Sequence, residues 1–215
     1  MRLRRLTFVL MLLCGLWMAA CSESKRAPLG SPTDSELAGG RYTNLYFHFT
    51  LNVPAGWSVG ELKTASNRPP GAPTPTAPAA AEVRQEVTAY QLLILSEKPL
   101  APNTGINPSL LVMAEQTASV PKVKDAKDYL ARISQLMTDS PIAYRPVNGI
   151  TDFRIGGVPA VRMDFSARLG PQKSGYQRYV VCQREQYILS FILSGATEDD
   201  LKRLEPVMQS VKFHF

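Results

Sequence analysis

The chain has 215 residues, of which 24 are Lys or Arg and 18 are Asp or Glu, giving a formal charge of +6. Hydrophobic residues make up 45% and charged residues 20%, a balance that excludes a chain disordered throughout and suits one domain with a sizeable core. Three of the basic residues (Arg2, Arg4 and Arg5) lie in residues 1–20, which contain no acidic residue. Without that segment the formal charge is +3, with 21 basic and 18 acidic residues, so we expect no nucleic-acid partner.

Residues 1–20 have the pattern of an export signal. A short basic start is followed by residues 6–20, which carry no charge and are mostly apolar. This run is shorter than the roughly 20 apolar residues that a membrane-spanning helix needs. The sequence therefore predicts a signal peptide that is removed, in preference to a retained anchor.

The end of this segment favours a lipoprotein cleavage site. An ordinary signal peptidase requires small residues three and one positions before the cut, and Met18 or Trp17 would be too large at the outer position. The run Met18-Ala19-Ala20-Cys21 resembles the bacterial lipobox, with Met18 in place of the usual Leu. The resemblance implies cleavage between Ala20 and Cys21 and acylation of Cys21 with chains such as palmitate. Each buried methylene of such chains contributes about 0.8 kcal/mol to membrane binding.

Two segments have the composition of irregular chain. Residues 21–40 are rich in Ser, Pro, Gly and charge, and we predict a flexible tether there. Ser22 follows the predicted lipidated Cys21, and in the enteric sorting rule a residue other than Asp at this position implies the outer membrane. Residues 66–81 contain five of the 17 prolines and predict a Pro/Ala-rich surface loop, with a polyproline docking segment as the alternative.

The first half of the predicted domain contains strands and one helix. Residues 45–53 alternate between apolar and polar and predict a half-buried strand that ends at Pro54-Ala55-Gly56-Trp57, with Leu45, Phe47, Phe49, Leu51 and Val53 on one side. Residues 91–95 and 110–114 are short apolar runs typical of central strands. Residues 125–137 have apolar side chains at three- and four-residue steps, which predicts a helix capped by Asp125.

The second half predicts two hairpins and a final helix. Gly156-Gly157 separates residues 153–155 from residues 161–167, and residues 184–186 separate 176–182 from 187–193. A near capping box at Thr197 opens the last helix, which we expect Pro206 to kink or restart. Antiparallel strands with separate helices predict an α+β fold with a mostly antiparallel sheet and packed helices.

This order of elements resembles the PsbP-like family. Domains of that family commonly begin with an aromatic strand leading to Pro-x-Gly-Trp, as in residues 46–57, and end on Ser-x-x-Phe, as in residues 210–213. The resemblance covers residues 41–215, and His48 departs from it because relatives often have Gly at that position. It implies an α/β/α sandwich around an antiparallel sheet, and an accessory or binding role in preference to catalysis.

Groups that could perform chemistry are scarce in the sequence. The chain has only two His residues, His48 and His214, and it contains neither a Gly-x-Ser-x-Gly elbow nor a Cys-x-x-Cys or His-Glu-x-x-His motif. We therefore expect no catalytic residue, no metal and no cofactor. Once Cys14 leaves with the signal and Cys21 is acylated, Cys182 is the remaining thiol; we predict that it packs in the core and leave its reactivity open.

A partner surface is the remaining candidate site. Trp57 either fills the edge of the core or presents a recognition surface. Basic residues in the hairpin region could form a face for lipid headgroups or an acidic protein, and they are Arg162, Arg168, Lys173, Arg178 and Arg184. The alternative is a solvated sheet face, because Asp164 and Glu185 lie among them.

Together these features predict a lipid-anchored, non-catalytic binding or assembly module on the periplasmic face of the outer membrane. Its partners would be the membrane, through the lipid, and an envelope protein. Two alternatives stay open: an envelope enzyme with an unrecognised site, and a carrier of a small apolar ligand. A deep pocket with converging titratable groups would favour the enzyme.

Overall fold

A computed structural model describes residues 30–60, 89–99, 106–120, 122–142, 144–170 and 173–214. The predicted signal peptide, the cleavage site at Ala20 and Cys21, and the Pro/Ala-rich segment 66–81 lie outside these ranges.

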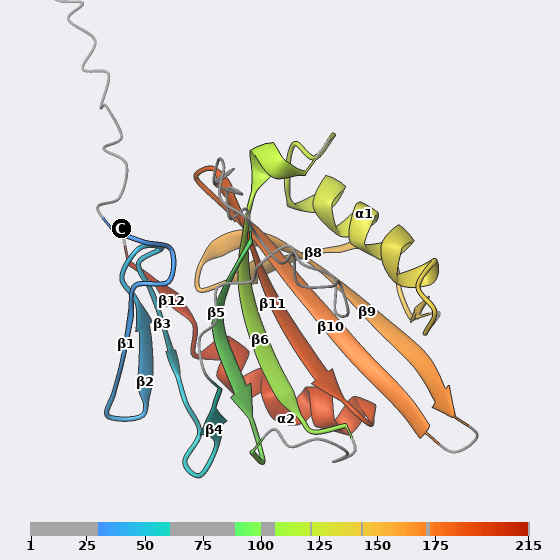
Figure 1. Cartoon of the computed structure of the whole chain (residues 1–215), viewed down its shortest axis with the longest axis horizontal. Helices are drawn as coiled ribbons and strands as arrows, with labels where there is room; N and C mark the ends of the chain where they lie inside the picture. The colour runs from blue at the N-terminus through green and yellow to red at the C-terminus, as the bar shows by residue number, and fades with distance from the viewer. Residues whose placement is uncertain are drawn as a thin grey trace, which may run out of the picture.

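The described strands form two antiparallel sheets (Figure 1). The small sheet has the order β1-β2-β3-β12 and contains β1 (Ser35–Ala38), β2 (Arg41–Asn44), β3 (Phe49–Asn52) and β12 (Lys212–Phe213). The large sheet has the order β4-β5-β6-β11-β10-β9-β7, and β8 also pairs with β9. Its strands are β4 (Ser58–Val59), β5 (Ala89–Ser96), β6 (Ser109–Gln116), β7 (Arg145–Pro146), β8 (Thr151–Ile155), β9 (Val158–Gly170), β10 (Lys173–Arg184) and β11 (Tyr187–Gly195).

Two helices cover different faces of the large sheet (Figure 1). Helix α1 (Ala126–Thr138) packs Tyr129 and Leu130 against Phe165 of β9 and Val181 of β10. Helix α2 (Glu198–Gln209) packs Leu204 into a second core cluster that also contains Val180 of β10, the residue next to Val181. Because neighbouring residues of a strand point to opposite faces, the helices lie on opposite sides of β10. A short 3-10 helix, η1 (Thr117–Ser119), follows β6.

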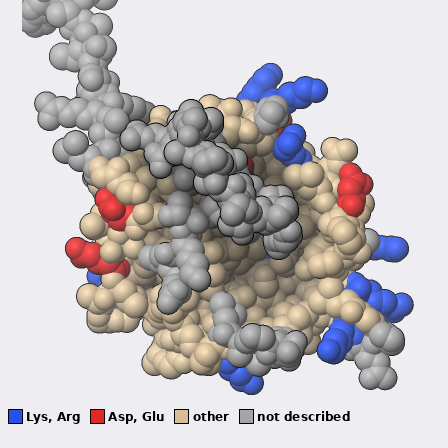
Figure 2. Space-filling model, in the orientation of Figure 1, with Lys and Arg blue, Asp and Glu red and all other residues tan. Residues whose placement is uncertain are grey.

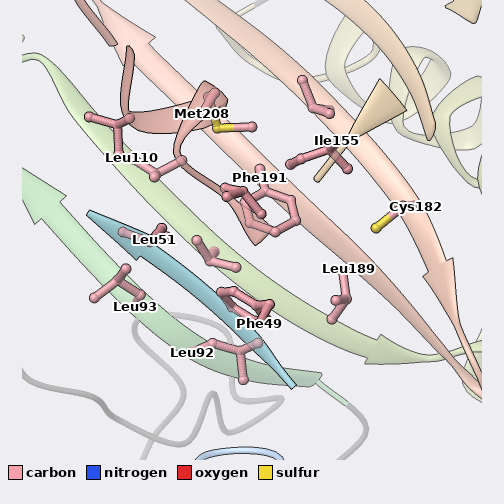
Figure 3. Close-up of a cluster of buried hydrophobic side chains, with 14 of the residues drawn as sticks. Phe49, Leu51, Leu92, Leu93, Leu110, Ile155, Cys182, Leu189, Phe191 and Met208 are labelled. Carbon is pink, nitrogen blue, oxygen red and sulfur yellow. The ribbon is translucent and has the colours of Figure 1, made fainter. Parts of the chain in front are cut away.

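The core on the α2 side also contains the small sheet. Figure 3 shows Phe49 and Leu51 of β3 beside Phe191 of β11 and Leu92 and Leu93 of β5, and all five side chains are 0% exposed. The described residues thus form a mostly antiparallel β structure with two helices, and the α+β prediction is confirmed at that level.

Both predicted helix starts are confirmed. The Asp125 carboxylate accepts a hydrogen bond from the backbone N–H of Asp128 at 2.8 Å. Thr197 and Asp200 form a reciprocal capping box. Helix α2 runs through Pro206 to Gln209, so of the two expected effects, a kink or a restart, the restart does not occur. Proline leaves the carbonyl of Lys202 without its helical donor, but both residues are exposed and water can serve that carbonyl.

The strand predicted at residues 45–53 is shorter in the structure. Residues 45–48 form turns, and β3 begins at Phe49. The side chain of Asn44 is fully buried and accepts a hydrogen bond from the backbone N–H of Phe47 at 2.7 Å, which closes this turn between β2 and β3. Leu45, predicted to face the core, is 46% exposed, whereas Phe49 and Leu51 are buried as predicted.

The predicted tether ends earlier than residue 40. Ser35–Ala38 form β1, which pairs with β2 across Gly39 and Gly40. Both glycines have positive φ angles, 56° and 70°, as a type I′ hairpin turn requires. The domain therefore starts no later than residue 30, not at residue 41.

We predict that His48→Gly raises the free energy of unfolding. His48 has a φ angle of 52°, a left-handed conformation that costs an L residue about 1–2 kcal/mol. Glycine removes this strain but loses more entropy on folding, so the net gain should be about 0.5–1 kcal/mol by urea unfolding. His48→Asn should fall between the two proteins, because Asn tolerates this conformation, and His48→Val should lose stability. A less stable His48→Gly protein would contradict this account.

Two adjacent glycines in the β8–β9 turn should respond differently to alanine. Gly156 and Gly157 have φ angles of 54° and 85°, so a Cβ at either position costs about 1 kcal/mol of unfolding free energy. A Cβ on Gly156 would also lie 2.9 Å from the carbonyl oxygen of Val211, whereas nothing lies within 4 Å of one on Gly157. Gly156→Ala should therefore lose about 1–3 kcal/mol more than Gly157→Ala in chemical denaturation. Equal losses would show that the hairpin does not press on the segment before β12.

Candidate functional site

Trp57 is half-buried and lies against the core. Its backbone N–H donates to the carbonyl of Pro54 at 3.2 Å, which closes the turn after β3, and its ring packs on the α2-side cluster. Trp57 was predicted either to fill the edge of the core or to present a recognition surface, and the structure shows it packed at the edge of the core.

Arg178 is held inside the protein by two carboxylates. Its guanidinium donates to both oxygens of Asp164 at 2.8 Å each, and its third contact is with Oε1 of Glu205 in α2, at 2.6 Å. The Arg178 and Asp164 side chains are only 14% and 15% exposed. The hydrogen bonds with Asp164 raise the pKa of Arg178 further. Arg178 therefore ties β9, β10 and α2 together, and its charge is already matched.

The other basic residues do not gather in one patch. Arg184 lies over the ring of Phe213, with its guanidinium carbon 5.1 Å from the ring centroid, and Arg162 lies over Phe153 at 5.5 Å. Arg168 is exposed and pairs in register with Ser174, far along the hairpin from the Arg162–Val180 pair. Lys173, at the end of β10, is also exposed. On the face shown in Figure 2, Lys and Arg lie in separate groups near the margin.

An open cavity of about 480 Å³ brings two of these arginines together. It lies between the C-terminal half of α2, the β8–β9 hairpin and the large sheet, and both Arg162 and Arg178 line it. Its apolar wall consists of Phe153, Val180, Leu193, Met208 and Val211, and its other lining residues are Arg154, Gly156, Gly157, Glu205 and Gln209. We name it the α2 cavity. Trp57, Arg168 and Arg184 do not line it.

No motif in the sequence points directly to the α2 cavity. Its wall combines the β8–β9 hairpin with α2, about fifty residues later, and only the fold brings them together. The available signal was a polar row on β9 that alternates with buried residues: Arg162 and Asp164 lie between Val161, Met163 and Phe165. Polar side chains on a strand face that a helix covers must either pair with other polar groups or line a binding site, because burying them without a partner is costly.

Cys182 is confirmed as a core residue. It is 0% exposed, and burial raises the pKa of its thiol to about 12. At neutral pH the thiol is therefore protonated and shielded from reagents in the folded protein.

A second buried polar group lies on the α1 side of the sheet. The hydroxyl of Tyr129 donates to the carboxylate of Glu115 at 2.9 Å, and burial raises the pKa of this hydroxyl. The contact joins α1 to β6, a structural role.

The two histidines lie beside each other near β12, outside the α2 cavity. The backbone N–H of His214 donates to the carbonyl of His48 at 2.8 Å, and its ring nitrogen Nε2 lies 3.3 Å from Oγ1 of Thr50. Within the described ranges, no three His, Cys, Asp or Glu side chains are grouped as metal ligands would be. None of the described helices is long and apolar enough to cross a membrane.

Comparison with known proteins gives a fold and no close relative. No family model and no curated protein matches the chain. The solution structure of cyanobacterial PsbP from Synechocystis sp. PCC 6803 is similar, with a TM-score of 0.50 and 16% identity over 86% of this chain and 95% of that one. This likeness supports the PsbP-like fold that the resemblance implied; at this identity it speaks to the fold alone.

Two further solved structures are more distant. LpqN of Mycobacterium tuberculosis, described as involved in cell envelope biogenesis, gives a TM-score of 0.44 at 12% identity over 87% of this chain and 88% of its own. A protein of unknown function from Pseudomonas aeruginosa, described as a putative regulator, gives a TM-score of 0.39 at 19% identity. The match covers 73% of this chain and 96% of that one. Neither likeness is strong enough to carry an argument about this chain.

We predict that Arg178→Met strongly destabilises the protein, although Met is of similar length. The substitution leaves Asp164 largely buried without its cation, which should lower the free energy of unfolding by about 3 kcal/mol. Arg168→Met, on the same side of the hairpin but exposed, should change it by less than about 0.5 kcal/mol. Adding Asp164→Asn to Arg178→Met should recover part of the loss. Similar unfolding midpoints for the two single variants would mean that Arg178 is not structural.

Proposed function

We propose that the chain is a lipid-anchored, non-catalytic binding module of the bacterial cell envelope. The observation that carries this proposal is the run Met18-Ala19-Ala20-Cys21 at the end of a 15-residue uncharged segment with a basic start. A signal of this kind directs export and acylation together, so the domain would work at a membrane surface. Ser22 after the acylated residue favours the periplasmic face of the outer membrane.

The domain architecture supports a module held close to that surface. The domain begins by residue 30, so residues 22–29 are all that separate Cys21 from it. The nine Cα–Cα steps from Cys21 to residue 30 reach at most about 32 Å even when fully extended. The end of the domain that carries the start of β1 would therefore stay near the bilayer. The PsbP-like α/β/α sandwich, supported by helices on opposite sides of β10, would present its other surfaces to an envelope protein partner.

The state of the reactive groups supports binding in preference to catalysis. Asp164 is paired with Arg178, and the Cys182 thiol is buried and protonated. The backbone N–H of His214 donates to the carbonyl of His48, and the His214 ring lies 3.3 Å from the Thr50 hydroxyl at an exposed position outside the α2 cavity. A second candidate, a carrier of a small ligand, is favoured by one observation, the α2 cavity with its apolar wall.

Lipidation at Cys21 can be tested in cells that express the full chain. Wild-type protein should incorporate labelled palmitate and sediment with outer-membrane vesicles on a density gradient. Cys21→Ser should lose the label and leave the membrane pellet, because the acceptor thiol is gone. Cys14→Ser is the matched control: it removes a thiol seven residues earlier, within the predicted signal, and should behave as wild type. A Cys21→Ser protein that remained labelled and membrane-bound would refute the anchor.

A further inference from the structure

Arg162 is a half-buried cation without a protein anion to match it. Its Nε atom is buried and has no hydrogen-bond partner. Its guanidinium lies over the ring of Phe153, and no carboxylate in the described part of the chain forms an ion pair with it. A buried donor of a charged group that lacks an acceptor carries a desolvation cost of about 1–3 kcal/mol or more. The structure bears this cost at the wall of the α2 cavity.

The charge of the α2 cavity is unbalanced at Arg162. Arg178 lines the same cavity, but Asp164 and Glu205 together satisfy it. Arg154, also in the lining, is exposed and donates to the carbonyl of Gly157. The uncompensated positive charge in the sheltered part of the cavity is therefore that of Arg162. A guanidinium matches the geometry of a carboxylate, with two parallel hydrogen bonds.

The rest of the wall favours an apolar body next to that carboxylate. Apolar surface comes from β8, β10, β11, the end of α2 and the segment before β12, through Phe153, Val180, Leu193, Met208 and Val211. The volume of about 480 Å³ falls within the range of roughly 300–1,000 Å³ that small-molecule sites occupy. Glu205 also lines the cavity, so a ligand with more than one negative charge would be repelled. The chemistry of the wall thus selects a monoanion with an apolar chain.

We propose that the α2 cavity binds an aliphatic monocarboxylic acid, with Arg162 holding the carboxylate and the apolar wall holding the chain. Each methylene that leaves water contributes about 0.8 kcal/mol, so affinity rises with chain length until the cavity is filled. This site does not depend on the lipid anchor, because none of its lining residues belongs to the export segment. The two proposals therefore succeed or fail separately.

Photolabelling of the full chain in whole expressing cells tests this site, whether or not the chain is bound to a membrane. The probe is decanoic acid with a diazirine at the far end of its chain, and the labelled peptides are mapped by mass spectrometry. Saturable label should map to the segments around Phe153 and Met208. Unlabelled decanoate should compete with the probe, whereas decanol, which has the same chain without the charge, should compete at least tenfold more weakly.

Variants assign the carboxylate contact to Arg162. Arg162→Gln should raise the half-saturating probe concentration about tenfold or more, the loss expected for one charge-assisted contact. Arg162→Lys keeps the positive charge but not the two parallel N–H donors of the guanidinium, so it should lose less affinity than Arg162→Gln. Arg168→Gln, on the same strand but exposed and outside the cavity, is the matched control and should bind as wild type. Gln209→Trp, at an exposed lining position, should block labelling by filling the cavity without changing its charge.

Folding of each variant is checked by its thermal unfolding midpoint, so that lost labelling is not confused with lost structure. Equal half-saturation for wild type and Arg162→Gln would overturn the proposal. It would equally fail if decanol competed as well as decanoate, or if the label mapped to segments outside the α2 cavity.

Discussion

Burial of the Phe49 ring is the contact on which both sheets depend. Phe49 is 0% exposed, and its ring centroid lies 5.8 Å from that of Tyr42 and 5.7 Å from those of Phe191 and Phe213. These four rings come from β3, β2, β11 and β12, so they join the small sheet to the large one. Strands as short as these are not stable alone, because a sheet needs an apolar face packed on another layer. The hydroxyl of Tyr42 in β2 donates to the carbonyl of Leu92 in β5 at 2.8 Å, and this hydrogen bond helps to fix the small sheet relative to the large one.

The position of α2 follows from this arrangement. The small sheet covers part of one face of the large sheet, and α2 covers the part beside it through Leu201, Leu204 and Val207. The ion pair between Glu205 and Arg178 fixes the middle of the helix to β10. Its last turn and the β8–β9 hairpin both line the α2 cavity. The same packing that anchors the helix therefore forms a site at which Arg162 and Arg178 meet an apolar wall.

Local patterns predicted much of this fold, and long-range contacts account for what they missed. The alternation of Val161, Met163 and Phe165 and the capping box at Thr197 are local signals, and both are confirmed. Residues 45–48 also alternate between apolar and polar, but they form a turn that the buried Asn44 side chain closes. The spacing of hydrophobic residues does not predict such a side-chain contact. Gly39 and Gly40 make the same kind of turn as Gly156 and Gly157, yet their Ser- and Pro-rich neighbours gave them the composition of a tether. The partners of each arginine depend on which helix covers its side of the sheet. The composition of the sequence does not predict which helix that is.

The pairing of β12 with β3 has a consequence for the time at which the protein can fold. Lys212 pairs with Thr50 and Phe213 with Phe49, so the small sheet is closed by residues at the very end of the described chain. Contacts between residues so far apart in sequence form slowly, because the entropy of closing a long loop opposes them. During synthesis the aromatic cluster lacks Phe213 until residue 213 has been made, more than 160 residues after Phe49. The export that we propose would need a chain that is still unfolded, and a core that depends on residue 213 stays unfinished while the first residues of the chain are already available to an export machinery.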